Sequence, residues 1–145
     1  MIKKINHIGI AVSSIEDAVK LYTDVLGLKV KDIEIVEDQK VKTAIIPLGE
    51  SKIELLESTD PEGVIANYIE RRGEGIHHLA FEVSNIQDAL EALVEKGIPL
   101  IDEKPRNGVE NTRIAFLHPR RTKVLIELVE PRKQRGGRRR QPNKR

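Results

Sequence analysis

The 145-residue chain contains no cysteine. Disulfides, thiolate metal ligands and thiol nucleophiles are therefore excluded, and any bound metal ion must be held by nitrogen and oxygen atoms. The chain also lacks an apolar run near the roughly 18 residues that a membrane-spanning helix needs. Residues 1–4, Met-Ile-Lys-Lys, lack the apolar segment of a signal peptide. We expect a soluble cytoplasmic protein with no membrane contact.

Acidic residues are missing from the C-terminal segment, residues 132–145, which contains eight of the 25 lysines and arginines. Residues 1–131 then have 17 basic against 23 acidic residues, a net charge of −6. Because residues 132–145 include no large apolar side chain, we predict a disordered basic tail. It could bind nucleic acid or another acidic partner, or it could be a solvated tail. The lack of interleaved aromatic residues favours the solvated tail over nucleic-acid contact.

The rest of the chain contains an internal repeat. Segment 5–18 aligns without a gap with segment 76–89, so that His7 is equivalent to His78, 71 positions later. The segments Ile-Glu-Leu-Leu-Glu and Ile-Glu-Leu-Val-Glu match at an offset of 73, which makes Glu54 equivalent to Glu127. We interpret the chain as two copies of one module.

Hydrophobic periodicity predicts the same order of elements in both copies. In the first copy we expect one helix, from an N-cap at Ser13 or Ser14 to Gly27, and four strands, over 4–12, 28–36, 40–48 and 52–56. In the second copy we expect a helix over 86–97 and four strands, over 77–83, 99–103, 112–117 and 123–129. A short helix that begins at Asp60-Pro61 and ends at Gly73 is expected between the copies.

These patterns predict an α+β fold in which two tandem βαβββ modules form one curved mixed sheet with a metal site in its cleft. A single domain over residues 1–131 would comprise module one at 3–57, a connection at 58–74 and module two at 75–131. A chain of this size buries roughly two-thirds of the surface that its unfolded form exposes. The two modules must therefore share one fold.

The repeat selects four candidate ligands, His7, Glu54, His78 and Glu127. Glu127 is flanked on its face of the strand by Leu125 and Val129, which indicates burial, and a buried carboxylate needs a partner. If a pseudo-twofold axis relates the modules, the four side chains converge. Two imidazoles and two carboxylates suit Co²⁺, Ni²⁺, Zn²⁺ or Mn²⁺, with positions left for water or substrate.

The alternative is that each of these residues is an ordinary strand residue, packed in the core or on a wet sheet face. Spacing alone does not decide between the two. Two further histidines need an interpretation. Alternation along the strand places His77 on the opposite face from His78, as a packing or supporting residue. We expect His118 in a loop before the last strand, as a candidate pocket residue.

At these residues the sequence resembles the vicinal oxygen chelate superfamily, which is also described as the glyoxalase/bleomycin resistance/dioxygenase superfamily. Within it, the resemblance is strongest to the methylmalonyl-CoA epimerases. It covers about residues 3–130, and the order and spacing of its motifs are specific. The motifs are segments 7–12, 47–49, 53–57, 73–80, 116–119 and 124–128.

The resemblance implies one divalent metal ion per chain, held by His7, Glu54, His78 and Glu127, and an acyl-CoA substrate. The implied reaction interconverts (R)- and (S)-methylmalonyl-CoA by proton transfer at C2, through an enolate that the metal ion stabilises. One acid/base role is assigned to Glu127. The resemblance also implies a homodimer with each metal site within one chain.

One part of the pattern is absent. Some relatives carry a second base, a glutamate, on the strand that corresponds to residues 41–44, Val-Lys-Thr-Ala, where this chain has no acid. The second role then falls to another group, such as Glu54 or a metal-bound water, or the reaction differs.

Other functions remain open at this stage. A glyoxalase I-type lactoylglutathione lyase ranks lower, because segment 118–121 reads His-Pro-Arg-Arg where those enzymes usually have Asp-Pro-Asp-Gly. A ring-opening dioxygenase would normally keep only one carboxylate beside two histidines. A non-catalytic ligand-binding protein of the same fold is the third alternative, because a fold alone does not give a function.

Overall fold

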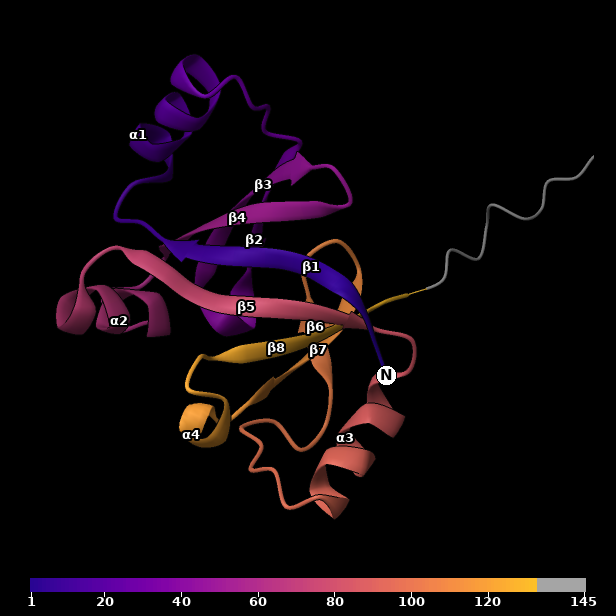
Figure 1. Ribbon diagram of the computed structural model, residues 1–145. Coiled ribbons are helices and arrows are strands. Elements are labelled where there is room, and N and C mark those ends of the chain that lie inside the picture. The colour runs from indigo at the N-terminus through magenta and orange to yellow at the C-terminus, as the bar shows by residue number, and fades with distance from the viewer. Residues whose placement is uncertain (133–145) are drawn as a thin grey trace, which may run out of the picture.

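The computed structural model describes residues 1–132, so the predicted basic tail lies, except for Arg132, outside the described residues. Figure 1 shows one curved sheet with helices packed against it. The strands are β1 (Ile2–Ala11), β2 (Asp32–Val36), β3 (Val41–Leu48), β4 (Ser51–Ser58), β5 (Gly75–Val83), β6 (Arg106–Gly108), β7 (Thr112–Leu117) and β8 (Ile126–Pro131). The helices are α1 (Ile15–Lys20), continued by a π-helical turn at Leu21–Val25, a 3₁₀ turn at Glu37–Gln39, α2 (Val64–Arg72), α3 (Ile86–Glu95) and α4 (Pro119–Thr122).

The eight strands form one mixed sheet in the order β2-β3-β4-β1-β5-β8-β7-β6. β1 pairs in parallel with β4, and β5 pairs in parallel with β8. The two modules meet at the antiparallel pair of β1 and β5, in the middle of the sheet (Figure 1). The predicted α+β fold of two βαβββ modules in one curved sheet is therefore confirmed. No helix within residues 1–132 is long and apolar enough to cross a membrane.

Each module buries its helix against the outer face of the sheet. The cluster under α1 consists of Val12, Ile15, Ala44, Ile46 and Leu55. The cluster under α3 includes Val83, Ile86, Leu90, Ala115 and Leu128. Burial of each large aliphatic side chain contributes about 1.5–3 kcal/mol. Because side chains alternate along a strand, the neighbours of Leu55 and Leu128 point to the inner face, where the site lies.

A carboxylate near the end of the last strand of each module caps the N-terminus of that module's helix. Glu57, at the end of β4, accepts a hydrogen bond from the backbone N–H of Ile15 at 2.8 Å. Glu130, at the equivalent place in β8, accepts one from Ile86 at 2.9 Å. Both carboxylates thus satisfy a free N–H group at a helix N-terminus, where negative charge is favourable. The repeat is structural as well as sequential.

The strand predicted over 99–103 is wrong, because only one isolated bridge forms there, between Leu100 and Leu117. Proline at position 99 has no N–H to donate, and the Asp102 side chain accepts the N–H of Phe116 at 2.9 Å. This side-chain bond replaces a ladder bond. The second strand of module two forms later, as β6.

Other boundaries shift at turns. The strand predicted over 28–36 begins only at residue 32. The connecting helix begins at Val64, because Asp60 first closes a turn by accepting hydrogen bonds from Glu62 and Gly63. α4 was not predicted. Its N-cap is His118, whose Nδ1 accepts the N–H of Arg120. This exposed residue therefore caps a helix, and it is not among the residues that line the cavity beside His78 and Glu127.

Candidate metal centre

The four central strands bring the predicted ligands together. His7 comes from β1, Glu54 from β4, His78 from β5 and Glu127 from β8. All four side chains are buried, with 3–5% of their surface exposed. They share the inner face of the sheet because side chains alternate along each strand, and residues at the alternate positions, such as Leu55 and Leu128, pack under a helix on the outer face.

Small residues make room for the imidazoles. Gly9 pairs with Glu54 on one side and His78 on the other. Ala80, its equivalent in module two, pairs with His7 and Glu127. A Cβ atom at position 9 would lie 2.3 Å from Cε1 of His78. The ring of His78 can therefore occupy its observed place only because residue 9 has no side chain.

Three donor atoms lie close together. Nε2 of His7 and Nε2 of His78 are 3.0 Å apart. Oε1 of Glu127 is 3.1 Å from the first nitrogen and 3.0 Å from the second. Oε1 of Glu54 lies 3.4 Å from Nε2 of His7. Glu54 approaches from the β4 side and lies outside the mutually close trio of His7, His78 and Glu127.

This arrangement fits a divalent cation. Two ligand atoms bound about 2.1 Å from one ion at a right angle lie about 3 Å from each other, which matches the separations within the trio. Oε2 of Glu54 is buried and has no hydrogen-bond partner within residues 1–132. An unpaired buried carboxylate oxygen is costly, and a bound cation would satisfy it. The donor set is one of nitrogen and oxygen only.

Burial and charge oppose each other at the site. Burial lowers the pKa of His7, but Glu54 and Glu127 outweigh it and raise that pKa above its usual range. Burial raises the pKa of Glu127, yet hydrogen bonds from His7 and His78 bring it well below the usual range. Burial dominates at Glu54 and raises its pKa. An imidazole nitrogen binds metal only when it carries no proton, so a cation at this site would compete with the proton that the two carboxylates favour on His7.

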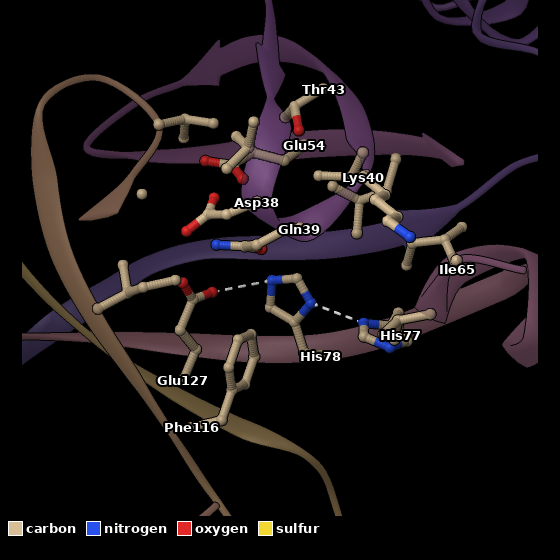
Figure 2. Close-up of a pocket in the computed structure, with 18 of the residues that line it drawn as sticks. Asp38, Gln39, Lys40, Thr43, Glu54, Ile65, His77, His78, Phe116 and Glu127 are labelled. Carbon is tan, nitrogen blue, oxygen red and sulfur yellow. Dashed lines mark hydrogen bonds and ion pairs between the residues drawn. The ribbon is translucent and has the colours of Figure 1, made fainter. Parts of the chain in front are cut away.

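His77 does not lie on the opposite face from His78, as alternation predicted. Its Nδ1 is 2.9 Å from Nδ1 of His78, and it lines the same cavity (Figure 2). Residue 77 is the extra residue of a β-bulge, because Gly9 pairs with residue 78 and Ile10 with residue 76. A bulge breaks the alternation of side chains. The supporting role that was also predicted for His77 agrees with this contact.

A cavity of about 460 Å³ opens beside the trio. Glu54, His78 and Glu127 line it, and much of the remaining wall is apolar, contributed by Val36, Val41, Leu56, Ile65, Ile114 and Phe116. Figure 2 shows Glu127, His78 and His77 along one side of the cavity. Polar and charged groups that line it include Asp38, Gln39, Lys40 and Arg106. Such a cavity takes a ligand with an apolar part and a polar group that reaches the histidines.

Sequence reasoning missed some of the residues around the site. Thr43 lines the cavity with 1% of its surface exposed, in the segment where the resemblance led us to look for an acid. Asp38 brings a carboxylate to the cavity from the 3₁₀ turn before β3. Asn6 lies behind His7, with Oδ1 2.7 Å from Nδ1 of that ring. Only its equivalence to His77 in the repeat could have indicated Asn6.

Known proteins are similar to this chain in sequence and in fold. The family model of the glyoxalase/bleomycin resistance protein/dioxygenase superfamily matches residues 6–116. The uncharacterized protein YqjC of Bacillus subtilis (strain 168) is 42% identical over 130 residues, which cover 89% of this chain and 93% of that protein.

Solved structures agree. The crystal structure of methylmalonyl-CoA epimerase from Mycobacterium tuberculosis has a TM-score of 0.88 and 36% identity, over 91% of this chain and 90% of that one. A methylmalonyl-CoA epimerase in complex with methylmalonyl-CoA and NH₄⁺ has a TM-score of 0.87 and 32% identity, over 90% and 96%. The fold, the sequence and the family model point the same way, and the chain belongs to the glyoxalase/bleomycin resistance protein/dioxygenase superfamily.

Proposed function

We propose that this protein is a metal-dependent isomerase, a methylmalonyl-CoA epimerase that moves a proton at C2 of an acyl-CoA thioester. The observation that carries the proposal is the buried set of two imidazoles and two carboxylates beside a cavity with an apolar wall. The similarity to epimerases, one of them in complex with methylmalonyl-CoA, supports the substrate class.

Glu127 is the residue that we assign to proton transfer. Both imidazoles contact its Oε1. Glu127 also lines the cavity. One of its oxygens faces the histidines, and we assign the other to the proton of the substrate. A carboxylate in hydrogen-bond reach of the reacting C–H is the geometry that general base catalysis requires.

His7, Glu54, His78 and Glu127 would hold one divalent ion, Co²⁺, Ni²⁺, Zn²⁺ or Mn²⁺. When bound, such an ion acts as a Lewis acid on carbonyl oxygens. The apolar wall of the cavity excludes water from the same space, which strengthens the electrostatic interactions inside it.

The second acid/base role needs a group other than Thr43, which has no titratable proton near neutral pH. Asp38 and Glu62 line the cavity and are not among the residues in contact with the imidazoles. Each is a candidate beside Glu54. Loss of C2 exchange with only one of the two enantiomers of methylmalonyl-CoA, in Asp38→Asn or Glu62→Gln, would identify the residue.

The direct test combines metal analysis with isotope exchange. Protein purified without an affinity tag should contain about one divalent ion per chain, and it should incorporate deuterium from heavy water at C2 of methylmalonyl-CoA. The same sample should show no activity on the hemithioacetal of methylglyoxal and glutathione. Activity on the hemithioacetal alone would replace the proposal with a lactoylglutathione lyase. Ligand binding without either activity would indicate a binding protein.

We also propose a homodimer. Large apolar residues are exposed on the π-helical turn that continues α1 and directly after it, at Leu21, Val25 and Leu26, with 52–70% of each residue accessible. Such a patch is stabilised when a second surface covers it. We expect a dimer-sized species in sedimentation at micromolar concentration. A species of monomer size alone would refute the dimer without bearing on the metal site.

A further inference from the structure

We propose that Asn6 and His77 are positioning residues, one for each imidazole of the metal site, and that each directs the Nε2 lone pair of the following histidine into the site. The inference rests on the metal centre proposed above. It assigns a role to two residues that take no part in proton transfer and are not metal ligands themselves.

The first observation is a pair of matched irregularities in the central strands. Ile5 pairs with Phe81 and His7 with Ala80, so residue 6 is an extra residue in β1. The bulge at residue 77 in β5 occurs at the equivalent place, 71 positions later. Because a bulge interrupts alternation, each ligand histidine has its preceding residue on its own side. A regular strand would have turned that side chain away.

The second observation is the contact that each bulge creates. Oδ1 of Asn6 lies 2.7 Å from Nδ1 of His7, and Nδ1 of His77 lies 2.9 Å from Nδ1 of His78. The amide oxygen of Asn6 can only accept a hydrogen bond, so Nδ1 of His7 carries the proton that is donated to it. A partner at Nδ1 sets the tautomer of a metal-binding histidine and leaves Nε2 to the metal. The two Nε2 atoms, 3.0 Å apart, face each other as this requires.

The positioning residues are themselves held. Nδ2 of Asn6 donates to Oε1 of Glu82 at 3.0 Å, which orients the amide oxygen toward the ring of His7. The ring of His77 packs edge-on against Tyr68 of α2, with centroids 4.8 Å apart. A neutral imidazole at residue 77 has one lone pair with which to accept the Nδ1 proton of His78.

A purely structural role is the competing explanation, since buried polar groups generally find partners. The two explanations differ in what they affect. A packing role changes the stability of the metal-free chain, whereas a positioning role changes metal affinity and the tautomer of His78. Replacement by a different acceptor should preserve a positioning role, and module one already uses an asparagine for it.

The test compares His77→Phe, which keeps a ring against Tyr68 but removes the acceptor, with His77→Asn, which copies the arrangement at residue 6. Isothermal titration with Co²⁺ should show affinity that is about 10- to 100-fold lower in His77→Phe and close to that of the unaltered protein in His77→Asn. His118→Phe, an exposed histidine substitution outside the cavity, is the matched control and should bind Co²⁺ normally. Melting temperatures without metal report any packing effect separately.

A spectroscopic readout completes the test. In the Zn²⁺-loaded protein, ¹⁵N-edited NMR should show an Nδ1–H proton of His78 protected from exchange with water, and this protection should be lost in His77→Phe. Unchanged Co²⁺ affinity in His77→Phe, or equal loss in His77→Asn, would overturn the inference. If the unaltered protein binds neither Co²⁺ nor Zn²⁺, the metal centre itself is refuted and the inference with it.

Discussion

In the proposed mechanism, Glu127 is the one residue that both binds the metal ion and transfers the proton. In Glu127→Gln, volume and one oxygen donor are preserved, so the chain should fold and metal affinity should fall less than turnover. Loss of the titratable group should slow C2 exchange by about 10²- to 10⁴-fold. Bound metal, melting temperature and C2 exchange of the one variant provide the measurement.

The opposite pattern would identify a structural carboxylate. Removing one partner of a buried charged pair costs about 3–5 kcal/mol, so a structural Glu127 would show a large loss of stability with activity in proportion to the folded fraction. Near-native exchange with metal still bound would remove Glu127 from the catalytic assignment.

Gly9 is a residue whose missing side chain matters. In Gly9→Ala the new Cβ would meet the imidazole of His78 at 2.3 Å, so the ring must move. We expect metal affinity to fall by at least about tenfold, a change of about 1.4 kcal/mol in binding free energy. Co²⁺ titration measures it.

The repeat supplies the control. Ala80→Gly empties the equivalent position beside His7 and adds no atom near either imidazole. It should lower the free energy of unfolding by about 0.5–1 kcal/mol and leave metal affinity in place. A Co²⁺ affinity of Gly9→Ala equal to that of Ala80→Gly would show that Gly9 does not make room for His78.

At the scale of elements, each module connects its last strand to the start of its helix through one carboxylate. Glu130→Ala removes the acceptor for the Ile86 N–H. By comparison with other helix caps, it should lower the free energy of unfolding by about 0.5–2 kcal/mol, without change in metal affinity. Urea unfolding measures the loss.

Glu57→Ala is the matched variant in module one, because Glu57 makes the same bond to Ile15. The two losses should be similar in size. A variant whose stability equals that of the unaltered protein would show that the carboxylate is replaced by water at no cost.

At the scale of the whole molecule, a turn of module two bridges to module one and brings the ends of the sheet together. The carboxylate of Glu110, between β6 and β7, contacts Nζ of Lys52 at 2.6 Å and Nζ of Lys31 at 2.7 Å. Its backbone N–H donates to Glu34 of β2 at 3.2 Å. Burial raises the pKa of Glu110, but the two lysines outweigh it and bring that pKa below its usual range.

The lowered pKa gives the sign of a pH effect. The ion pair stabilises the fold when Glu110 is charged in the unfolded chain too, above about pH 4.5. The contribution is lost as the pH falls through the lower folded-state value. Glu110→Gln should therefore be less stable than the unaltered protein at pH 7, by up to about 1 kcal/mol for the pair with Lys52, and this difference should shrink as the pH falls below about 4.5.

Thermal unfolding at several pH values and at high salt measures this difference. Salt screens partly exposed pairs, so 1 M NaCl should shrink the gap at pH 7. A gap that persists unchanged at pH 3 would show that Glu110 acts through packing or its backbone conformation.

The amino-acid sequence by itself determined the repeat, and with it the four residues that meet at the centre. Strand 112–117 was predicted with its observed bounds, and Ser14, one of the two serines predicted as the N-cap of the first helix, caps α1. These features depend on periodicity and on neighbours along the chain, which sequence patterns report directly.

Only the tertiary structure decided the features that depend on pairing between distant strands. The bulges that turn Asn6 and His77 toward the histidines arise from the register of β1 against β5, and alternation along one strand predicts the opposite orientation. The strand predicted over 99–103 failed because Asp102 takes the N–H of a residue 14 positions away. The contacts of Glu110 likewise join residues more than 50 positions apart. A local pattern records the preferences of a segment, whereas register and closure depend on the partner that the fold supplies.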